Sequence, residues 1–482
     1  MNDIVFQPAR RLARLLRTRK LSAVEVMRAF IAQVERVNPA VNAIVTFLPE
    51  EALKEAKRID AKRSRAKGAD PIGPLAGLPI AYKDMIATKG IRTTQGSRIY
   101  AHHVPTADHA IVERLRAAGA ITLGKTNTPE FAAGSQTFNE VFGATRNPWD
   151  TTKTCGGSSG GAAVAVACGM LPFADGSDLG GSLRNPGNFN GVVGFRPTPG
   201  RVPSFPAIDT WATMSVLGPI ARTVDDAAFL LSAMAGPDLR SPITITEPGS
   251  VFAKPLKRDF RKTRVAWWPI ENGRLRGDDP MPVDPRVVAV LERQKNALRA
   301  MGCIVEDAAP DLSGAAEVFH VIRALGYVQR LGPLLAKHRH LMKDTVVWNT
   351  EEGLGMDASR IAAALNGRAG LFHRMRQFLE RYDFLCLPVN QVPPFPVTQP
   401  YVTEIAGVKL ASYIDWMKSA YYITTTSHPA ISVPAGFTDD RLPLPVGLQV
   451  VGRYRDDFGV LQFAHAFEQA AGVAGRRPPV AR

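Results

Sequence analysis

The chain has 482 residues, of which 45% are hydrophobic and 21% charged, so it can bury a substantial core and is not disordered as a whole. Its formal net charge is +15, but the basic residues are spread along the chain rather than gathered in one run. The densest basic stretches, 10–20 and 254–264, lack the interleaved aromatic residues of a strand-binding groove, which argues against a nucleic-acid partner.

The first elements are helical and then alternate with strands. Ser22 and Glu25 form a capping box before an amphipathic pattern that predicts a helix ending near Pro39. A strand over 42–47 and a charged helix over 50–65 follow. A linker at 68–77 then leads to an apolar run at 78–82, which predicts a buried strand with Lys83 at its carboxyl end.

The alternation continues to the end of the chain. Asp108 is expected to start a helix that Gly119 stops, and 120–123 predicts a short buried strand. Later predictions are helices at 162–168, 285–302 and 457–470, and strands at 303–306, 383–387, 430–434 and 446–451. Helices alternating with short apolar strands indicate an α/β layered sheet.

Two common motifs match the sequence, and both are rejected. Residues 119–126 fit the phosphate-loop expression, but their variable positions are the predicted strand at 120–123 rather than a loop. Residues 157–161 fit the G-x-S-x-G elbow with Ser159 at its centre. That elbow needs a histidine late in the chain, and neither His428 nor His465 lies in a segment that can be tied to it.

Cysteine spacing and hydropathy bear on location. The four cysteines (155, 168, 303 and 386) have neither C-x-x-C spacing nor neighbouring histidines, so neither a disulfide framework nor a zinc site is expected. The longest small apolar run, 160–174, is too short to span a bilayer. The first twenty residues lack a secretory apolar region. We therefore expect a cytoplasmic protein with no membrane and no metal.

The segment that carries the chemistry begins at Thr154. Two turns rich in glycine and serine, one containing Ser158 and the other Ser182, flank a helix of small apolar residues. Such turns are usually flexible loops. Here both adjoin strongly apolar segments, so their backbone is expected to be buried and to present N–H groups of the kind an oxyanion hole needs.

This segment resembles the signature of the amidase signature family. The resemblance extends over nearly the whole chain, through PLAGLPIAYKD around Lys83, GKTNTPEF at 124–131, FGATRNPWD before the signature, and HPAISVPAGF with PVGLQVVG near the end. It implies a single α/β domain over 1–482 with the amidase signature fold, a central mixed β-sheet covered by helices on both faces. Within it we distinguish an N-terminal helical region (1–67), a catalytic signature core (68–235), a variable elaboration near the active-site mouth (236–400) and a C-terminal return to the core (401–482).

The resemblance also implies roles for individual residues. Lys83 matches the family's catalytic lysine, Ser158 its bridging serine after a cis Gly157–Ser158 peptide, and Ser182 its nucleophile. The positions whose backbone amides would form the oxyanion hole are Leu179, Gly180 and Gly181, and the substrate-contacting loop position is Ala132.

Elementary chemistry supports a lysine base. Serine needs a base to take its proton, and burial of Lys83 would lower its pKa and favour the neutral amine. We expect Asp178 and Arg184 to hold the second turn rather than react, because a charged partner beside Lys83 would keep it protonated. Ser159 is expected to orient the site.

The sequence departs from the family pattern in three places: Ser177 replaces a threonine, Cys155 stands where proline or a small residue is frequent, and 188–190 replaces an apolar-Cys-Gly run. Ser177 keeps the hydroxyl, and Cys155 is expected to be a buried, inert thiol. All three catalytic positions are intact.

The predicted function is hydrolysis of carboxylic amides through an acyl-enzyme, without metal or cofactor, with carbamates and esters as further substrates. Aromatic residues in the second half favour neutral, apolar or aryl amides, and a monomer or homodimer acting on a small-molecule amide is expected. Arg323 and Asp415 leave open a glutamine-hydrolysing component of a tRNA-dependent amidotransferase. A catalytically silent interaction protein on the same scaffold is the other alternative.

Overall fold

The computed structural model describes residues 2–65, 73–277 and 281–482. Its largest element is a mixed sheet of eight strands in the order β13-β9-β14-β18-β17-β7-β8-β6. The pairs β13–β9 and β9–β14 are parallel, and the remaining neighbours are antiparallel. The strands are β6 (Phe173–Asp178), β7 (Val193–Arg196), β8 (Val216–Ala221), β9 (Arg264–Trp267), β13 (Ile304–Asp307), β14 (Phe384–Pro388), β17 (Ala430–Phe437) and β18 (Pro445–Gly452).

A second, three-stranded sheet has the order β1-β3-β2, with β1 antiparallel and β2 parallel to the central strand. Its strands are β1 (Ile44–Phe47), β2 (Pro79–Lys83) and β3 (Ile121–Thr126). Strand β2 packs against β6, the edge strand of the large sheet. The described chain also contains two short strand pairs, β4 (Phe138–Asn139) with β5 (Gly143–Ala144) and β15 (Glu404–Ile405) with β16 (Val408–Lys409). A further small sheet has three strands, β10 (Ile270–Glu271), β11 (Arg274–Leu275) and β12 (Met281–Pro282).

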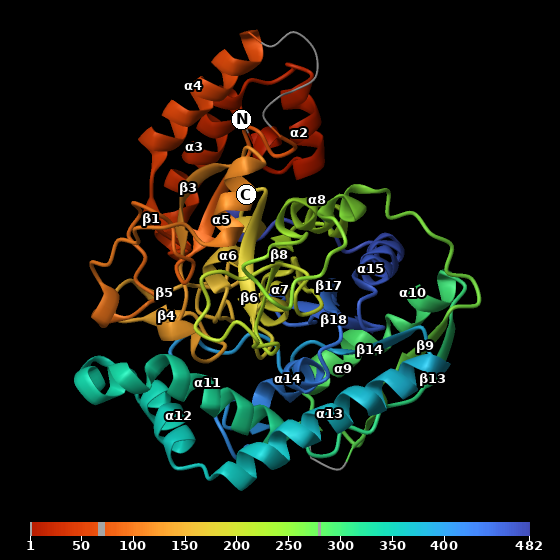
Figure 1. Cartoon of the computed structure of the whole chain (residues 1–482). Coiled ribbons are helices and arrows are strands. Elements are labelled where there is room, and N and C mark those ends of the chain that lie inside the picture. The colour runs from red at the N-terminus through yellow and green to blue at the C-terminus, as the bar shows by residue number, and fades with distance from the viewer. Residues whose placement is uncertain (1, 66–72, 278–280) are drawn as a thin grey trace.

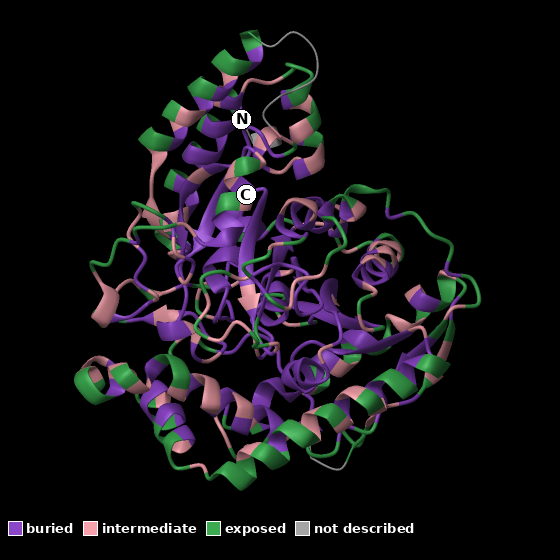
Figure 2. Ribbon diagram, in the orientation of Figure 1, coloured by how far each residue is buried: buried purple, intermediate pink, exposed green. Residues whose placement is uncertain are grey.

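Helices cover both faces of the large sheet (Figure 1). Gly447 and Gly452 of β18 point to opposite faces because they are an odd number of residues apart. A Cβ at Gly447 would meet Asn188 of α7, and one at Gly452 would meet Val460 of α15. The covering helices are α6 (Gly160–Ala167), α7 (Arg184–Asn190), α8 (Val224–Met234), α9 (Pro285–Glu292), α10 (Lys295–Ala300), α14 (Lys418–Thr425) and α15 (Asp457–Ala471). Figure 2 shows that the sheet and these helices form the buried centre.

Three helices lie along the opposite end of the molecule from the N-terminus (Figure 1). They are α11 (Ala315–His338), α12 (Asp344–Leu354) and α13 (Ala358–Arg381). All three lie in segment 236–400, which was expected to be an elaboration at the mouth. The same segment also supplies β9, β13 and β14 to the large sheet. It therefore belongs to the core as well.

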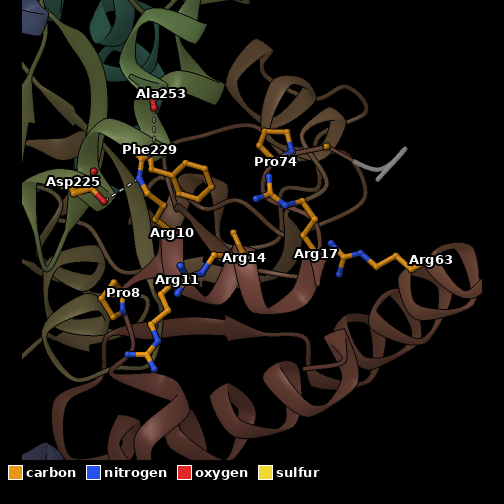
Figure 3. A pocket seen from close by; sticks show the side chains of 12 residues that line it. Pro8, Arg10, Arg11, Arg14, Arg17, Arg63, Pro74, Asp225, Phe229 and Ala253 are labelled. Carbon is orange, nitrogen blue, oxygen red and sulfur yellow. Dashed lines mark hydrogen bonds and ion pairs between the residues drawn. The ribbon is translucent and has the colours of Figure 1, made fainter. Parts of the chain in front are cut away.

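The N-terminal helices are α1 (Asn2–Val5), α2 (Ala9–Arg17), α3 (Ala23–Val41) and α4 (Pro49–Arg65), and α5 (Ala110–Ala117) lies close to them. Helix α2 buries Ala9, Leu12 and Leu16, and Arg10 pairs with Asp225 at 2.9 Å. Its basic face lines a cavity of about 870 Å³ together with Arg63 (Figure 3). None of the predicted catalytic residues lines this cavity.

Several local predictions are confirmed. The capping box at Ser22 is present, and residues 121–126 form a strand, so the phosphate-loop match is a coincidence. The linker predicted at 68–77 lies partly outside the described residues.

Helix α3, expected to end near Pro39, ends at Val41, and the side chain of Asn38 accepts hydrogen bonds from the main-chain N–H groups of Ala43 and Ile44. Two local predictions are wrong. His109 rather than Asp108 caps α5, because Asp108 pairs with Arg116 instead. The helix predicted at 285–302 is divided into α9 and α10.

Candidate active site

The predicted general base lies at the carboxyl end of β2 and is fully buried. Lys83 Nζ lies 2.7 Å from Ser158 Oγ, 3.0 Å from Ser159 Oγ and 3.0 Å from Ser177 Oγ. In the ammonium form, these three oxygens accept its three N–H bonds. In the neutral form the lone pair of the amine is free to accept a proton from a hydroxyl. The three hydroxyl groups around Nζ therefore suit an amine that takes up and returns a proton.

Burial sets the proton affinity of this lysine. Transfer from water into the protein lowers the pKa of Lys83 to about 7, and the negative charges of Asp175 and Asp178 oppose that shift. A substantial fraction of Lys83 is therefore neutral near pH 7. No carboxylate was expected beside Lys83, but Asp175 lies there. Its Oδ1 accepts a hydrogen bond from the Lys83 main-chain N–H at 3.1 Å.

The two serine turns contact each other directly. The first turn precedes α6 and contains the cis Gly157–Ser158 peptide bond. The second connects β6 to α7 and contains Ser182, whose main-chain oxygen accepts a hydrogen bond from Ser159 N–H at 3.3 Å. Ser182 is 8% exposed, whereas Ser158 is 1% exposed, so Ser182 is the more accessible of the two.

Ser159 is held by the site rather than free to react. Its Oγ lies 3.0 Å from Lys83 Nζ and accepts a hydrogen bond from Ser177 N–H at 3.3 Å. No histidine contacts its hydroxyl in the described part of the chain. This arrangement is consistent with the rejection of the G-x-S-x-G elbow.

A buried ion-pair network fixes the turn that carries Ser182. Asp178 pairs with Arg184 at 2.9 Å and with Arg196 at 3.3 Å, and the side chains of all three have no exposed surface. The same carboxylate accepts the N–H groups of Gly181 and Leu183, at 3.0 and 3.2 Å. Burial alone would raise the pKa of Asp178, but the two arginines hold it well below its usual range. Asp178 and Arg184 therefore have the structural role expected of them.

The predicted oxyanion donors divide into two kinds. Gly181 N–H donates to Asp178, whereas the N–H groups of Leu179 and Gly180 have no acceptor within the described residues. Gly181 has a φ of +111°, and a Cβ there would lie 2.6 Å from Asn185 Oδ1, so the turn requires glycine. Leu179 and Gly180 are thus available to bind an oxyanion, and Gly181 shapes the turn.

A small pocket of about 20 Å³ is connected to the nucleophile turn through Ser135 and Asn185, and none of the predicted catalytic residues lines it. Ser135, one of its lining residues, accepts a hydrogen bond from Asn185 Nδ2 at 2.9 Å, and Asn185 N–H in turn donates to Gly181 O. Ala132, the predicted substrate contact, is the last residue of a short helical turn, two residues before Gly134, and has a φ of +59°. The lining residues are Gly134, Ser135, Gln136, Phe138, Lys343, Thr345, Pro400, Tyr401, Tyr413 and Trp416.

The aromatic residues in the second half of the chain, which were expected to favour apolar substrates, do not all lie at this pocket. Tyr401, Tyr413 and Trp416 line the pocket. Phe384 instead stacks on Phe463 in the core, at a ring-centroid distance of 4.2 Å. The pocket therefore has a partly aromatic lining, and not every aromatic residue in the second half of the chain contributes to it.

The two residues considered for a glutamine site have other partners. Arg323 donates to Tyr327 at 3.1 Å and to Tyr413 at 2.5 Å, and it also contacts Asn349. Asp415 accepts the N–H groups of Ala411 and Ser412. Each side chain is thus engaged within the protein.

Two residues of the site were not predicted from the sequence. The sequence shows that Ser177 keeps a hydroxyl, but the contacts of Ser177 and Asp175 with Lys83 arise only in the folded chain. Residues two apart on a strand face the same side, so recognising β6 would have placed both side chains toward β2. Cys155 is buried and burial raises its pKa to about 12, as expected of an inert thiol.

Two further features concern metals and membranes. In the described part of the chain, no three His, Cys, Asp or Glu side chains are grouped as a metal would require. Every helix over 2–65, 73–277 and 281–482 is too short or too polar to traverse a bilayer.

Comparison with known proteins gives consistent matches. Residues 25–461 match the family described as Amidase. The chain is 35% identical to a glutamyl-tRNA(Gln) amidotransferase subunit of Moorella thermoacetica, over 99% of each chain. It is 34% identical to an acylamidase of Rhodococcus erythropolis, over 98% of this chain and 96% of that one. A bacterial aryl acylamidase of the amidase signature family superposes with a TM-score of 0.87 at 26% identity, covering 98% and 99% of the two chains.

Proposed function

The chain belongs to the amidase signature family and is an amide hydrolase, and we propose that Ser182 is its nucleophile and Lys83 its general base, relayed by Ser158. The observation that carries this proposal is the 2.7 Å contact between Lys83 Nζ and Ser158 Oγ in a fully buried site. A neutral amine at that distance takes the Ser158 proton, and Ser158 takes the proton of Ser182.

The reaction proceeds in two halves. Ser182 Oγ attacks the amide carbonyl carbon, and the N–H groups of Leu179 and Gly180 bind the developing oxyanion. The ammonium of Lys83 then returns its proton through Ser158 to the leaving nitrogen, the C–N bond breaks and an acyl-enzyme remains. Water, deprotonated by the same relay, releases the acid. Ser159 and Ser177 hold the amine in place, and Ala132 supplies main-chain contact with the substrate.

The experiment is active-site labelling followed by mass spectrometry. A fluorophosphonate should modify Ser182 in the wild-type protein, and Ser182→Ala should abolish both labelling and turnover. Ser158→Ala and Lys83→Ala should retain weak residual activity, because loss of a base typically lowers the rate by about 10²–10⁴-fold. An adduct on Ser158 or Ser159 would contradict the assignment.

We further propose that the substrates are neutral amides with an apolar or aryl group, with carbamates and esters as weaker candidates. Tyr401, Tyr413 and Trp416 around the pocket support an apolar group. A glutamine site must pair an α-carboxylate and an α-ammonium. The internal partners of Arg323 and Asp415 leave those two side chains less suited to that task.

The assay for specificity is kinetic. The purified protein alone, as a monomer or homodimer, should hydrolyse an acyl anilide with kcat/KM at least about tenfold above that for glutamine, because a site lacking paired charges discriminates strongly against a zwitterion. Activity that prefers glutamine, or that needs tRNA and a second protein, would favour the amidotransferase alternative. Absence of labelling and turnover with every probe would favour the silent scaffold. We place the protein in the cytoplasm, which the four free, buried thiols support.

A further inference from the structure

Asp175 links the two sheets at the catalytic lysine. It lies on β6, the edge strand of the large sheet, and its side chain has no exposed surface. Its Oδ1 accepts the main-chain N–H of Lys83 at 3.1 Å, and Lys83 belongs to β2 of the small sheet. The carboxylate therefore fixes the backbone of the lysine from the neighbouring sheet.

The second carboxylate oxygen has no such partner. Asp175 Oδ2 is buried, and no donor within the described residues reaches it. Lys125 on β3 is the other buried cation that acts on this carboxylate, but its Nζ binds Ile86 O, Thr88 and Thr93. A buried carboxylate with one hydrogen bond is costly unless nearby positive charge compensates it. The positive charges of Lys125 and Lys83 do so only in part, because burial still raises the pKa of Asp175 above its usual value.

The other groups around Lys83 do not replace Asp175. Asp178 also acts on Lys83, but Arg184 and Arg196 pair with it directly. Asp84, the next residue in the chain, is bonded to Thr94 and compensates Lys125. The hydroxyls of Ser158, Ser159 and Ser177 are neutral. Asp175 is therefore the carboxylate near Lys83 that is not paired with an arginine within the described residues.

We propose that Asp175 is a positioning residue for the general base, which fixes the main chain of Lys83 and keeps its amine basic enough to take the serine proton. The proposal rests on the function proposed above, since it needs Lys83 to act as the base. Without a nearby anion, burial would make the amine too weak a base. With Asp175, the amine is neutral often enough to react and basic enough to accept a proton.

The substitution Asp175→Asn separates charge from geometry. The amide oxygen can still accept the Lys83 N–H, and the NH₂ group takes the place of an oxygen that has no donor. Removing the negative charge destabilises the ammonium form, so the pKa of Lys83 falls. The neutral form then persists to lower pH, and it is a weaker base.

The experiment is the pH profile of kcat/KM for an acyl anilide between pH 5 and 9. In Asp175→Asn the midpoint of the rising limb should move to lower pH by about one unit, the size of shift that one nearby charge imposes. The plateau should fall severalfold, as the base weakens. The pH dependence of fluorophosphonate labelling of Ser182 gives the same midpoint without turnover.

A matched control is Asp226→Asn. Asp226 is also a fully buried aspartate that accepts main-chain N–H groups, those of Ala9 and Arg10, but it lies on α8 away from the site. Its variant should leave the midpoint unchanged. Asp175→Ser, smaller and also neutral, is the second test variant should the first fail to fold, and its midpoint should move the same way.

A folded neutral variant with the wild-type midpoint would overturn the proposal. So would an equal displacement in the Asp226 control, because the effect would then follow from general destabilisation. Failure of the proposed function looks different. In that case Ser182→Ala would keep its activity or its label, whatever the profile of the Asp175 variants.

Discussion

Replacing Asp178 by asparagine tests the network beneath the nucleophile. The carboxylate is shared by two fully buried arginines and by the N–H groups of Gly181 and Leu183. The amide of asparagine occupies nearly the same volume but carries no charge. Arg184 and Arg196 would then be two buried cations without an anion between them.

The cost of this change can be worked from the geometry. Removing one partner from a buried ion pair typically destabilises a protein by about 3–5 kcal/mol. For a chain of 482 residues the unfolding entropy is about 1 kcal/mol per kelvin, so Tm should fall by about 3–5 °C. Turnover should also fall, because Gly181 and Leu183 bond to different oxygens of this carboxylate and asparagine has only one oxygen, so one N–H group of the turn that carries Ser182 loses its acceptor.

The pH dependence of this loss has a definite sign. The folded pKa of Asp178 lies below its unfolded value of about 3.9. Its contribution to stability is therefore complete above pH 4 to 5 and is lost as pH falls through the folded value. The difference in Tm between wild type and Asp178→Asn should shrink as the pH is lowered below about 4.

Calorimetry or circular dichroism on both proteins provides the assay. Glu306→Gln is the control, since it breaks a 2.9 Å pair with Arg264 between side chains that are 36% and 47% exposed. That variant should show no measurable change, because exposed ion pairs contribute little. If Asp178→Asn has the same Tm as the wild type at pH 7, the ion-pair network does not stabilise the protein as argued.

Three further outcomes follow from the site. Wild-type kcat/KM should rise with pH through about 7 as Lys83 loses its proton, and a profile flat from pH 5 to 9 would refute a lysine base. Ser177→Ala should lower kcat roughly tenfold with little change in KM, because one of the three hydroxyls around Lys83 Nζ is lost. Ser177→Thr keeps a hydroxyl and should restore kcat. If kcat of the Thr variant is as low as that of the Ala variant, the effect comes from packing. Gly181→Ala should reduce kcat by about 10²-fold or more while the protein remains folded, since the added Cβ would displace Asn185; near-normal kcat would mean that the turn tolerates the change.

The residues of the site that lie in short continuous sequence motifs could be predicted from the sequence. Lys83 at the end of an apolar strand and the two serine turns were located correctly, because apolar periodicity and glycine clusters are local signals. The same holds for the mixed sheet with helices on both faces, which the family resemblance implied.

The remaining parts of the site depend on packing between segments that are far apart in the sequence. Strand β6 contains Asp175, Gly176, Ser177 and Asp178, all poor strand formers, and its position in the sheet overrides their preferences. Helix α7 includes Pro186, Gly187 and asparagines, and it is buried along its whole length. Neither element has a local pattern that distinguishes it from a loop. The contacts of Asp175 and Ser177 with Lys83 could not be seen without β6.

The division of the catalytic groups between two sheets has a consequence for how the enzyme is inactivated. Lys83 is carried by the small sheet and Ser182 follows the edge strand of the large one, and the two sheets meet at β2 and β6. A local opening along that boundary would separate base from nucleophile while both sheets remain intact. Local openings require less free energy than global unfolding. Catalysis should therefore disappear at lower denaturant concentrations than secondary structure does, and loss of activity would be an early signal of movement between the sheets.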